Sequence, residues 1–326
     1  MNPSIPLKTK NILDIKILWL TPYGKDKLWD PALRLRRINV HEQFQKFGIN
    51  SNFIFNCLDY NDEYLLKEIK NSNLVVFTEQ SERDLFLTKE ARKLNIPTMR
   101  DHCEYMFTGD LQDDCFRETD LVVCSSTYIA QKSSERGYKV CVIPDMWEPT
   151  PLCKIKNTAG NLQAVYMGSP GLLTKMLYRE DYSRAIKEAG YELNVITSLE
   201  GIKNNKDILW NLNTWPQYYS QFDVALCPQD IWSFPGKSNV RVAQALAAGY
   251  PIIASPIQSY KESLNNCGLL AYSPDDWKEA LIKLKNPLLR IELHKRALLK
   301  SKEYSPQNIS KMWLTKMQAA IEEKQL

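Results

Sequence analysis

The side chains with the clearest chemical use stand at the start of one predicted helix, in the second half of the chain. A Pro-Gly turn precedes the helix expected over Val240–Ala248, and Ser238 is placed to cap it. Lys237 and Arg241 are four residues apart, so both can face the same side of the first turn. Because a helix N-terminus presents unpaired N–H groups and a partial positive charge, two cations there complete an anion site. The alternative is an exposed Lys–Arg pair on an ordinary surface helix.

A second group of candidates, suited to proton transfer, lies in the first half of the chain. Residues 96–100 read as a strand, and Asp101, His102 and Glu104 follow at the strand end where open α/β sheets bind ligands. His102 and Asp101 are the expected catalytic side chains, and a histidine with only a structural hydrogen bond is the alternative. Residues 101–120 are rich in acids, which predicts a solvated loop or, alternatively, a lid over an acceptor.

Three arginines near the N-terminus have two interpretations. Arg34, Arg36 and Arg37 follow Trp29 in a short basic and aromatic segment. The pattern favours ordinary arginines at the exposed start of a surface helix. The alternative is contact with an anionic acceptor, such as a lipid-linked diphosphate.

Alternating strands and helices must position these groups. Apolar runs predict strands at 15–20, 52–55, 74–78, 96–100, 121–125 and 139–144, and then at 164–167, 193–197, 224–228 and 251–255. Amphipathic segments predict helices at 33–47, 63–69, 82–94, 128–136, 182–189, 217–222, 240–248, 275–284, 288–302 and 306–323. The aperiodic stretch 145–161 breaks this rhythm and is the expected linker. The fold class is therefore α/β, with two Rossmann-like doubly wound domains facing a central cleft.

Composition narrows the class of protein. The 326 residues are 44% hydrophobic and 25% charged, which excludes a disordered chain or a coiled coil. Lys and Arg number 42 against 38 Asp and Glu, a net charge of +4 that is too weak to predict nucleic-acid binding. Eight cysteines without a CxxC pair indicate small buried residues and no metal site. Asp14 and Lys16 interrupt any leader-like apolar run, so a cytoplasmic location is expected, with peripheral membrane contact left open.

The segment from Phe234 to Tyr272 resembles the donor-binding segment of GT-B glycosyltransferases, particularly those of family 4. Its helix ends in ALAAGYP over 245–251, and the strand IIAS over 252–255 follows, with Glu262 further on and then GLL over 268–270. Further segments that look like the family's are DLVVCSS over 120–126, VIP over 142–144, VYMGS over 165–169 and QFDVALCP over 221–228.

The resemblance implies a GT-B enzyme with an acceptor-binding domain over 1–150 and a nucleotide-sugar donor domain over 151–305. A C-terminal helix over 306–326 would pack back on the first domain. The implied activity is transfer of a sugar from a UDP- or GDP-type donor to a glycan, lipid-linked or small-molecule acceptor. Transfer would be retaining and metal-independent, with no cofactor, because fixed cations would stabilise the leaving diphosphate.

The resemblance also implies roles for single residues. It places the diphosphate at the helix start, on Lys237, Ser238, Asn239 and Arg241. It places a second phosphate cation after the 168–169 turn, at Lys175. Further donor contacts facing the same cleft would come from Thr197 and Glu262. Family 4 members commonly carry two glutamates that here fall on Gly236 and Gln244, so neither acid is present. Gln244 could still bind a ribose hydroxyl. The alternatives are a nucleotide-sugar epimerase or phosphorylase of the same fold, or a non-catalytic nucleotide-sugar-binding protein.

Overall fold

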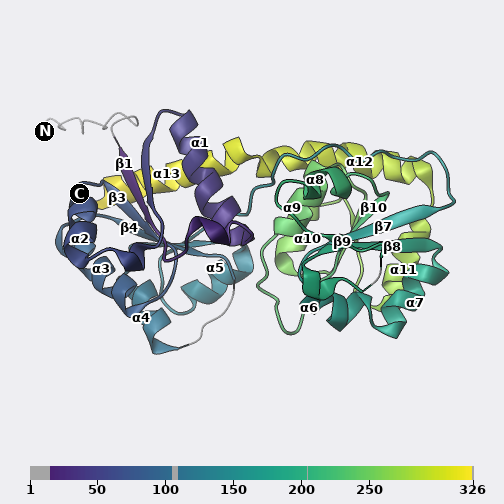
Figure 1. The fold of residues 1–326 in the computed structure, drawn as a ribbon, viewed down its shortest axis with the longest axis horizontal. Helices are drawn as coiled ribbons and strands as arrows, with labels where there is room; N and C mark the ends of the chain where they lie inside the picture. Colours follow the sequence, from purple (N-terminus) through teal and green to yellow (C-terminus); the bar gives the residue numbers. More distant parts are fainter. Residues whose placement is uncertain (1–14, 105–108, 204, 325–326) are drawn as a thin grey trace, which may run out of the picture.

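Two α/β halves lie side by side in the structure, which is a computed structural model (Figure 1). It describes residues 15–104, 109–203 and 205–324. The leader-like stretch considered above therefore lies mostly outside the described residues, as does part of the acidic segment 101–120. Within the described ranges each half contains a six-stranded sheet, and all strand pairs are parallel. The expected doubly wound architecture is confirmed.

The first half is built on the sheet β2-β1-β3-β4-β5-β6. Its strands are β1 (Lys16–Leu20), β2 (Asn50–Ile54), β3 (Leu74–Phe77), β4 (Thr98–His102), β5 (Leu121–Cys124) and β6 (Val140–Val142). Its helices are η2 (Lys25–Lys27), η3 (Ala32–Ile38), α1 (Asn39–Lys46), η4 (Cys57–Asp59), α2 (Asp62–Lys70), α3 (Glu82–Lys93), α4 (Asp110–Glu118) and α5 (Thr127–Ser134). The central strands β3 and β5 are fully buried apolar runs, as expected when helices cover both faces of a parallel sheet.

One segment of this half differs from the prediction. Residues 110–118 were expected in a loop because of their acids, yet they form the helix α4. Asp110 and Asp113 lie in its first turn, where the helix dipole favours negative charge. Cys115 and Phe116 are buried on its inner face. The acids are thus compatible with an ordinary covering helix.

The second half is built on the sheet β12-β11-β10-β7-β8-β9. Its strands are β7 (Leu162–Met167), β8 (Tyr191–Thr197), β9 (Ile208–Leu209), β10 (Val224–Cys227), β11 (Ile252–Ala254) and β12 (Leu269–Leu270). Its helices are α6 (Pro170–Leu172), η5 (Leu173–Leu177), α7 (Glu180–Glu188), η6 (Leu199–Gly201), α8 (Trp215–Tyr219), α9 (Val240–Ala247), α10 (Gln258–Leu264), α11 (Pro274–Lys283), α12 (Pro287–Ser301) and η7 (Lys302–Tyr304). The strand order reverses between β7 and β10, so the Rossmann-type ligand crevice lies outside the carboxyl ends of those two strands.

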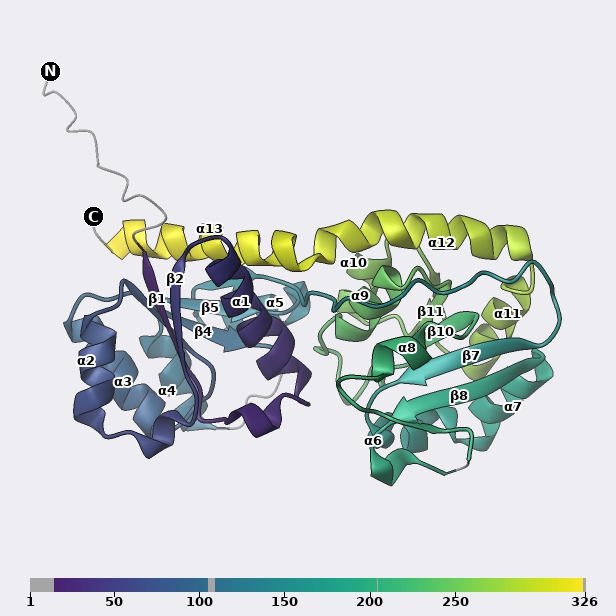
Figure 2. The ribbon, with the colours of Figure 1, turned by 45° about the horizontal axis from the view of Figure 1, so that its top comes forward.

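The chain passes between the halves twice. The first crossing is the irregular stretch that follows β6, and the second leads from η7 into α13 (Pro306–Lys324). Trp147 joins the two crossings, because its indole Nε1 donates to the Ser301 carbonyl at 2.7 Å and its backbone N–H to the Tyr304 carbonyl at 3.1 Å. Figure 2 shows α12 and α13 end to end along one side of both halves.

The helix α13 packs on the first half. Trp313 is fully buried, and its ring centroid lies 5.4 Å from that of Trp19 on β1. None of the helices described is both long enough and apolar enough to cross a membrane.

Candidate functional site

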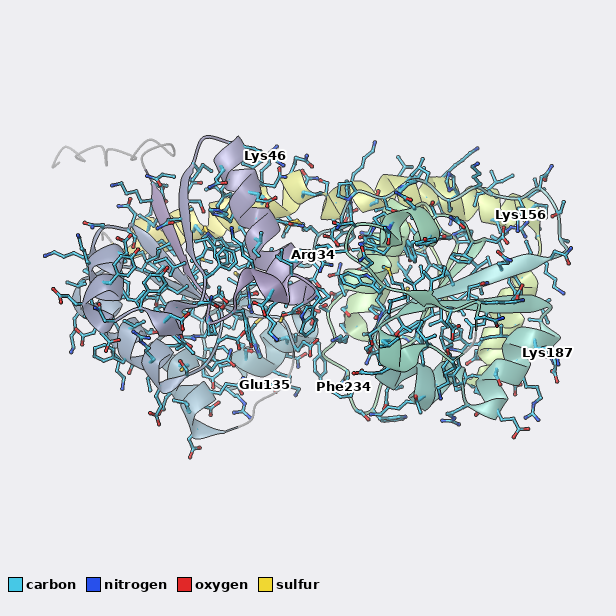
Figure 3. All side chains as sticks on the ribbon, in the orientation of Figure 1. Arg34, Lys46, Glu135, Lys156, Lys187 and Phe234 are labelled. Atoms are coloured by element: carbon cyan, nitrogen blue, oxygen red, sulfur yellow. The ribbon has the colours of Figure 1, made fainter. Side chains whose placement is uncertain are left out.

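A cavity of about 520 Å³ lies between the two halves. One wall comes from the loop after β1 and from η3 in the first half, and the opposite wall from the ends of β7 and β8 and from α9. Arg34 of η3 is seen at the boundary between the halves (Figure 3). Both walls lie at points where the strand order reverses, between β1 and β3 in one sheet and between β7 and β10 in the other. The cavity therefore occupies the position where doubly wound sheets bind ligands.

Arg241, in the first turn of α9, is a cation without a carboxylate partner. It lines the cavity, and among the described residues it makes no ion pair. Its Nη1 has only long contacts with neutral oxygens, on Tyr260 (3.5 Å), Pro228 (3.4 Å) and Gln229 (3.3 Å). A partly buried charge with no counter-charge is costly unless a ligand supplies one.

The turn after β7 fits closely against this guanidinium. A Cβ atom on Gly168 would lie 2.6 Å from the Tyr166 hydroxyl and 2.8 Å from Arg241 Nε. The Arg241 guanidinium carbon in turn lies 5.5 Å from the centroid of the Tyr166 ring, within cation–π range. Only glycine lets the turn and the cation come this close.

The start of α9 lacks a side-chain cap. The cap position is Asn239 rather than Ser238, and its side chain makes no capping hydrogen bond. The expected Ser238 cap is therefore wrong, and Ser238 lines the cavity instead. Lys237 also lines it and forms an ion pair with Glu104 of the first half. The N-terminal N–H groups of α9 thus have no side-chain acceptor from Ser238 or Asn239.

Not all of the predicted donor residues reach the cavity. Thr197 lines it, and its hydroxyl donates to the Gly168 carbonyl at 2.7 Å. Asn239 is buried behind the wall, where its Oδ1 accepts from the Asp145 N–H at 2.9 Å. Lys175 is exposed outside the wall, with its Nζ 5.5 Å from the Phe234 ring centroid. Glu262 on α10 also lies outside it and accepts a hydrogen bond from Thr127 of the first half.

Gln244 lines the cavity, but its amide is engaged by the chain connection. Its Nε2 donates to the Glu148 carbonyl at 3.0 Å, and its Oε1 accepts from the Glu148 N–H at 2.9 Å. The Glu148 carboxylate then accepts from Arg34 Nε at 2.7 Å and from Arg34 Nη2 at 2.9 Å. Gln244 therefore couples α9 to η3 through Glu148, and the predicted ribose contact stays a prediction.

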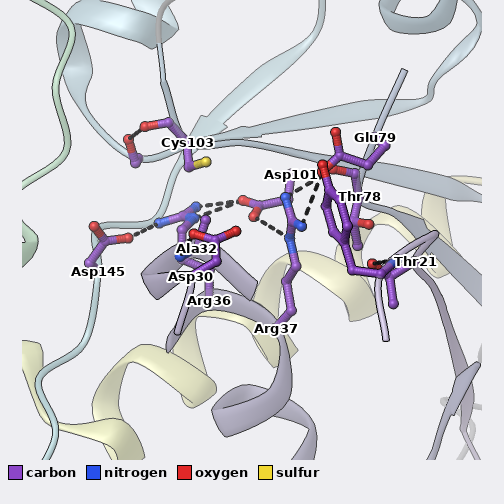
Figure 4. Close-up of polar contacts among 12 residues, drawn as sticks. Thr21, Asp30, Ala32, Arg36, Arg37, Thr78, Glu79, Asp101, Cys103 and Asp145 are labelled. Atoms are coloured by element: carbon purple, nitrogen blue, oxygen red, sulfur yellow. Dashed lines mark hydrogen bonds and ion pairs between the residues drawn. The ribbon is translucent and has the colours of Figure 1, made fainter. Parts of the chain in front are cut away.

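The arginines of η3 are buried, which contradicts the expected exposed helix start. Arg36 and Arg37 converge on Asp101 (Figure 4), whose carboxylate accepts from their Nε atoms at 2.8 and 3.1 Å. Arg36 Nη1 also donates to Asp145 at 2.8 Å and to the Ile143 carbonyl at 2.8 Å. Because carboxylates neutralise these charges, the arginines are not available to an anionic acceptor.

The predicted catalytic pair lies beneath the cavity rather than on its wall. Asp101 is 1% exposed and holds the arginines described above. His102 is 3% exposed, its ring centroid lies 4.7 Å from that of Phe116, and burial lowers its pKa to about 4. The next two residues, Cys103 and Glu104, do line the cavity. Burial raises the pKa of the Cys103 thiol, which keeps it neutral. The placement gives His102 and Asp101 no geometric support for proton transfer.

Four charged or aromatic wall residues were not anticipated from the sequence as site residues. They are Asp30, Asp145, Glu148 and Trp210. The sequence holds one local indication of two of them, because Asp145 and Glu148 lie on either side of Trp147 in a connection that has no other motif. Across the described ranges, no group of three or more His, Cys, Asp or Glu side chains is arranged to hold a metal ion.

Comparison with solved structures identifies the fold. HepE of Anabaena, solved with UDP and glucose, superposes with a TM-score of 0.66 at 12% identity, over 93% of this chain and 99% of that one. A Listeria monocytogenes protein described as a UDP-N-acetylglucosamine 2-epimerase gives 0.56 at 10% identity, over 95% and 97%. The pneumococcal O-GlcNAc transferase GtfA, with UDP and GlcNAc, gives 0.54 at 13% identity, and this chain covers only 60% of that longer protein. No protein-family model and no curated sequence matches the chain. The fold is GT-B.

Proposed function

We propose that the protein is a glycosyltransferase that uses a nucleotide-diphosphate sugar as its donor. The observation that carries this proposal is Arg241, a cation on the cavity wall for which the described residues provide no carboxylate. The uncapped start of α9 adds positive potential on the same wall, and Lys237 adds a further cation once its ion pair with Glu104 opens. A diphosphate supplies the missing negative charge.

The same wall suits the chemistry of transfer. The acceptor oxygen bonds to the anomeric carbon, the bond from that carbon to the β-phosphate oxygen breaks, and the hydroxyl proton passes to the departing diphosphate or to solvent. Negative charge grows on the diphosphate as its bond breaks. Fixed cations and N–H groups aimed there stabilise the transition state more than the ground state. On this basis the reaction is metal-independent, and the family 4 resemblance makes it retaining.

Both halves take part in the proposed reaction. The Gly168 turn, Thr197 and α9 form the donor wall, and the loop after β1 with η3 forms the acceptor wall. The resolved UDP complexes of HepE and GtfA, which share the fold, support a nucleotide-sugar donor. The acceptor is a glycan, lipid-linked or small-molecule hydroxyl.

A second candidate is a protein that binds nucleotide sugars without turning them over. The observation in its favour is Gln244, which occupies the position where a family 4 glutamate is expected. Both polar atoms of its side-chain amide are hydrogen-bonded to the backbone of Glu148. Turnover separates the two candidates.

The experiment has two stages. Thermal-shift screening of UDP, GDP, ADP and dTDP finds the nucleotide, because a ligand that binds only the folded state raises the melting temperature. Release of nucleotide from the matching sugar donors, with and without EDTA and acceptor mixtures, then tests catalysis, and NMR of the product gives its anomeric configuration. Binding without release supports the second candidate, an isomerised donor indicates an epimerase, and no nucleotide binding at all refutes the proposal.

A further inference from the structure

The acceptor wall of the cavity carries an excess of negative charge. From the first half and the connection, the arginines Arg34 and Arg36 line it, against four carboxylates, which are Asp30, Glu104, Asp145 and Glu148. Both arginines are already held by carboxylates at 2.7–2.8 Å. An acceptor bearing a phosphate or carboxylate here would meet these like charges, and both cations that line this wall are already paired with carboxylates.

Trp29 and Asp30 are the aromatic and acidic pair on this wall that we consider for a ligand, and the Trp29 ring has a contact with Lys27, whose Nζ lies 5.5 Å from the ring centroid. The Trp29 indole lines the cavity and remains 59% exposed. Asp30 makes no ion pair within the described part of the chain. One of its oxygens, Oδ1, accepts from the Ala32 N–H at 3.0 Å. An indole face packs on the apolar C–H face of a sugar ring, while a carboxylate accepts hydrogen bonds from its hydroxyls.

The loop that carries this pair is tied to the donor wall. Arg34 Nη1 donates to the Leu28 carbonyl, directly before Trp29. The other guanidinium nitrogens of Arg34 hold the Glu148 carboxylate, and the Glu148 backbone is held by Gln244 of α9. The chain of bonds thus runs from the donor helix to the acceptor loop.

We propose that Trp29 and Asp30 form the acceptor subsite, that this subsite takes a sugar without negative charge, and that the Arg34–Glu148 pair sets its distance from α9. The inference rests on the proposed function, because it assigns the acceptor class of that same cavity. Trp29 and Asp30 contact the acceptor, whereas Arg34 and Glu148 are positioning residues.

Ligand-detected NMR tests the acceptor class directly. The probes are methyl glycosides of glucose, galactose, mannose and N-acetylglucosamine, and the corresponding sugar phosphates, added to protein saturated with the nucleotide found above. Neutral glycosides are expected to bind, and Trp29→Ala or Asp30→Asn is expected to weaken that binding at least 10-fold. Trp232→Ala and Asp59→Asn are matched controls, because both residues are exposed and outside the cavity wall.

The outcomes distinguish this inference from the proposed function. Nucleotide that binds wild type and both site variants equally, together with no glycoside binding, overturns the subsite while leaving the donor site standing. Tighter binding of the sugar phosphates than of the neutral glycosides overturns the stated charge class. Absence of nucleotide binding to wild type refutes the proposed function itself.

The positioning pair needs its own readout. Glu148→Gln weakens the contact with Arg34 but keeps the backbone bonds to Gln244. It is expected to weaken glycoside binding 3-fold or more and to leave the nucleotide Kd within 2-fold, and Glu148→Asp is expected to restore part of the loss. If Glu148→Gln lowers the melting temperature yet leaves glycoside affinity unchanged, the pair only supports the fold and its positioning role is refuted.

Discussion

Replacement of Arg241 by methionine should separate a ligand-binding arginine from a structural one. Within the described residues Arg241 has no carboxylate partner, so Arg241→Met breaks no ion pair among them. It loses a cation–π contact with Tyr166, worth about 0.5–1 kcal/mol, but also removes an uncompensated charge from a partly buried position. The melting temperature should therefore stay the same or rise.

Ligand affinity should change in the opposite direction. A hydrogen bond to a charged group contributes about 1.5–3 kcal/mol, which corresponds to roughly a 10- to 150-fold weaker Kd for the nucleoside diphosphate. Lys237→Ala should weaken nucleotide binding less than Arg241→Met does, because the ion pair between Lys237 and Glu104 must break before Lys237 can bind the ligand. For the same reason, Glu104→Gln should tighten binding by up to about 5-fold, since a partly exposed pair is worth about 0–1 kcal/mol.

Isothermal titration with inorganic pyrophosphate and with UDP measures these effects, at two salt concentrations because exposed electrostatic contributions are screened. Arg184→Met is the matched control, since Arg184 belongs to the exposed face of α7 in the same half and pairs only weakly with Glu180 at 3.6 Å. An Arg241→Met protein that melts earlier and binds both ligands as wild type does would refute the reasoning and give Arg241 a purely structural role.

Three other substitutions test separate parts of the structure. Gly168→Ala places a Cβ within 2.6–2.8 Å of Tyr166 and Arg241, so it should displace the cation and weaken nucleotide binding about 10-fold or more in the same titration, with little change in the far-UV spectrum. His102→Gln should reduce the loss of stability at acid pH. In wild type the unfolded histidine takes up a proton below about pH 6.5 and the folded one only near its pKa of about 4, so the free energy of unfolding falls by up to about 3 kcal/mol as the pH falls through that window. Urea titrations at several pH values measure this difference between wild type and variant. Trp313→Ala removes the contact with Trp19 and should lower the free energy of unfolding, measured in urea, by about 3–5 kcal/mol. An unchanged unfolding midpoint would mean that α13 does not stabilise the first half.

Features set by neighbours in sequence could be predicted, and features set by distant partners could not. The strands β3 and β5 are recognisable because their apolar runs must be buried on both faces. Arg241 could be placed in the first turn of α9 because the signals for that helix are local, but Lys237 precedes the helix, which begins at Val240, so helical spacing does not explain why Lys237 reaches the same wall. Arg36, in contrast, is buried by Asp101 and Asp145, which lie 65 and 109 residues away. Nothing near Arg36 in the sequence distinguishes it from a surface arginine.

The same limit explains the fate of the predicted catalytic pair. The end of β4 was correctly expected near the cleft, but the strand runs through His102 instead of ending at residue 100, so the first residues beyond the strand lie two positions later than predicted. Asp101 and His102 turn to buried partners, while Cys103 and Glu104 reach the wall. The acids of residues 110–118 misled in another way, because the charge pattern of a solvated loop and that of a helix start with a favourable dipole are alike.

The two chain crossings at Trp147 restrict how the halves can move. Two rigid bodies joined by a single flexible segment can turn in any direction, but a second tether beside the first removes most of that freedom. The hydrogen bonds from Trp147 to Ser301 and Tyr304 keep the tethers adjacent, so they act as one hinge axis along the edge of the molecule. We expect any rotation of one half relative to the other to follow that axis. Such a rotation would change the width of the cavity and would keep the two walls in one register relative to each other.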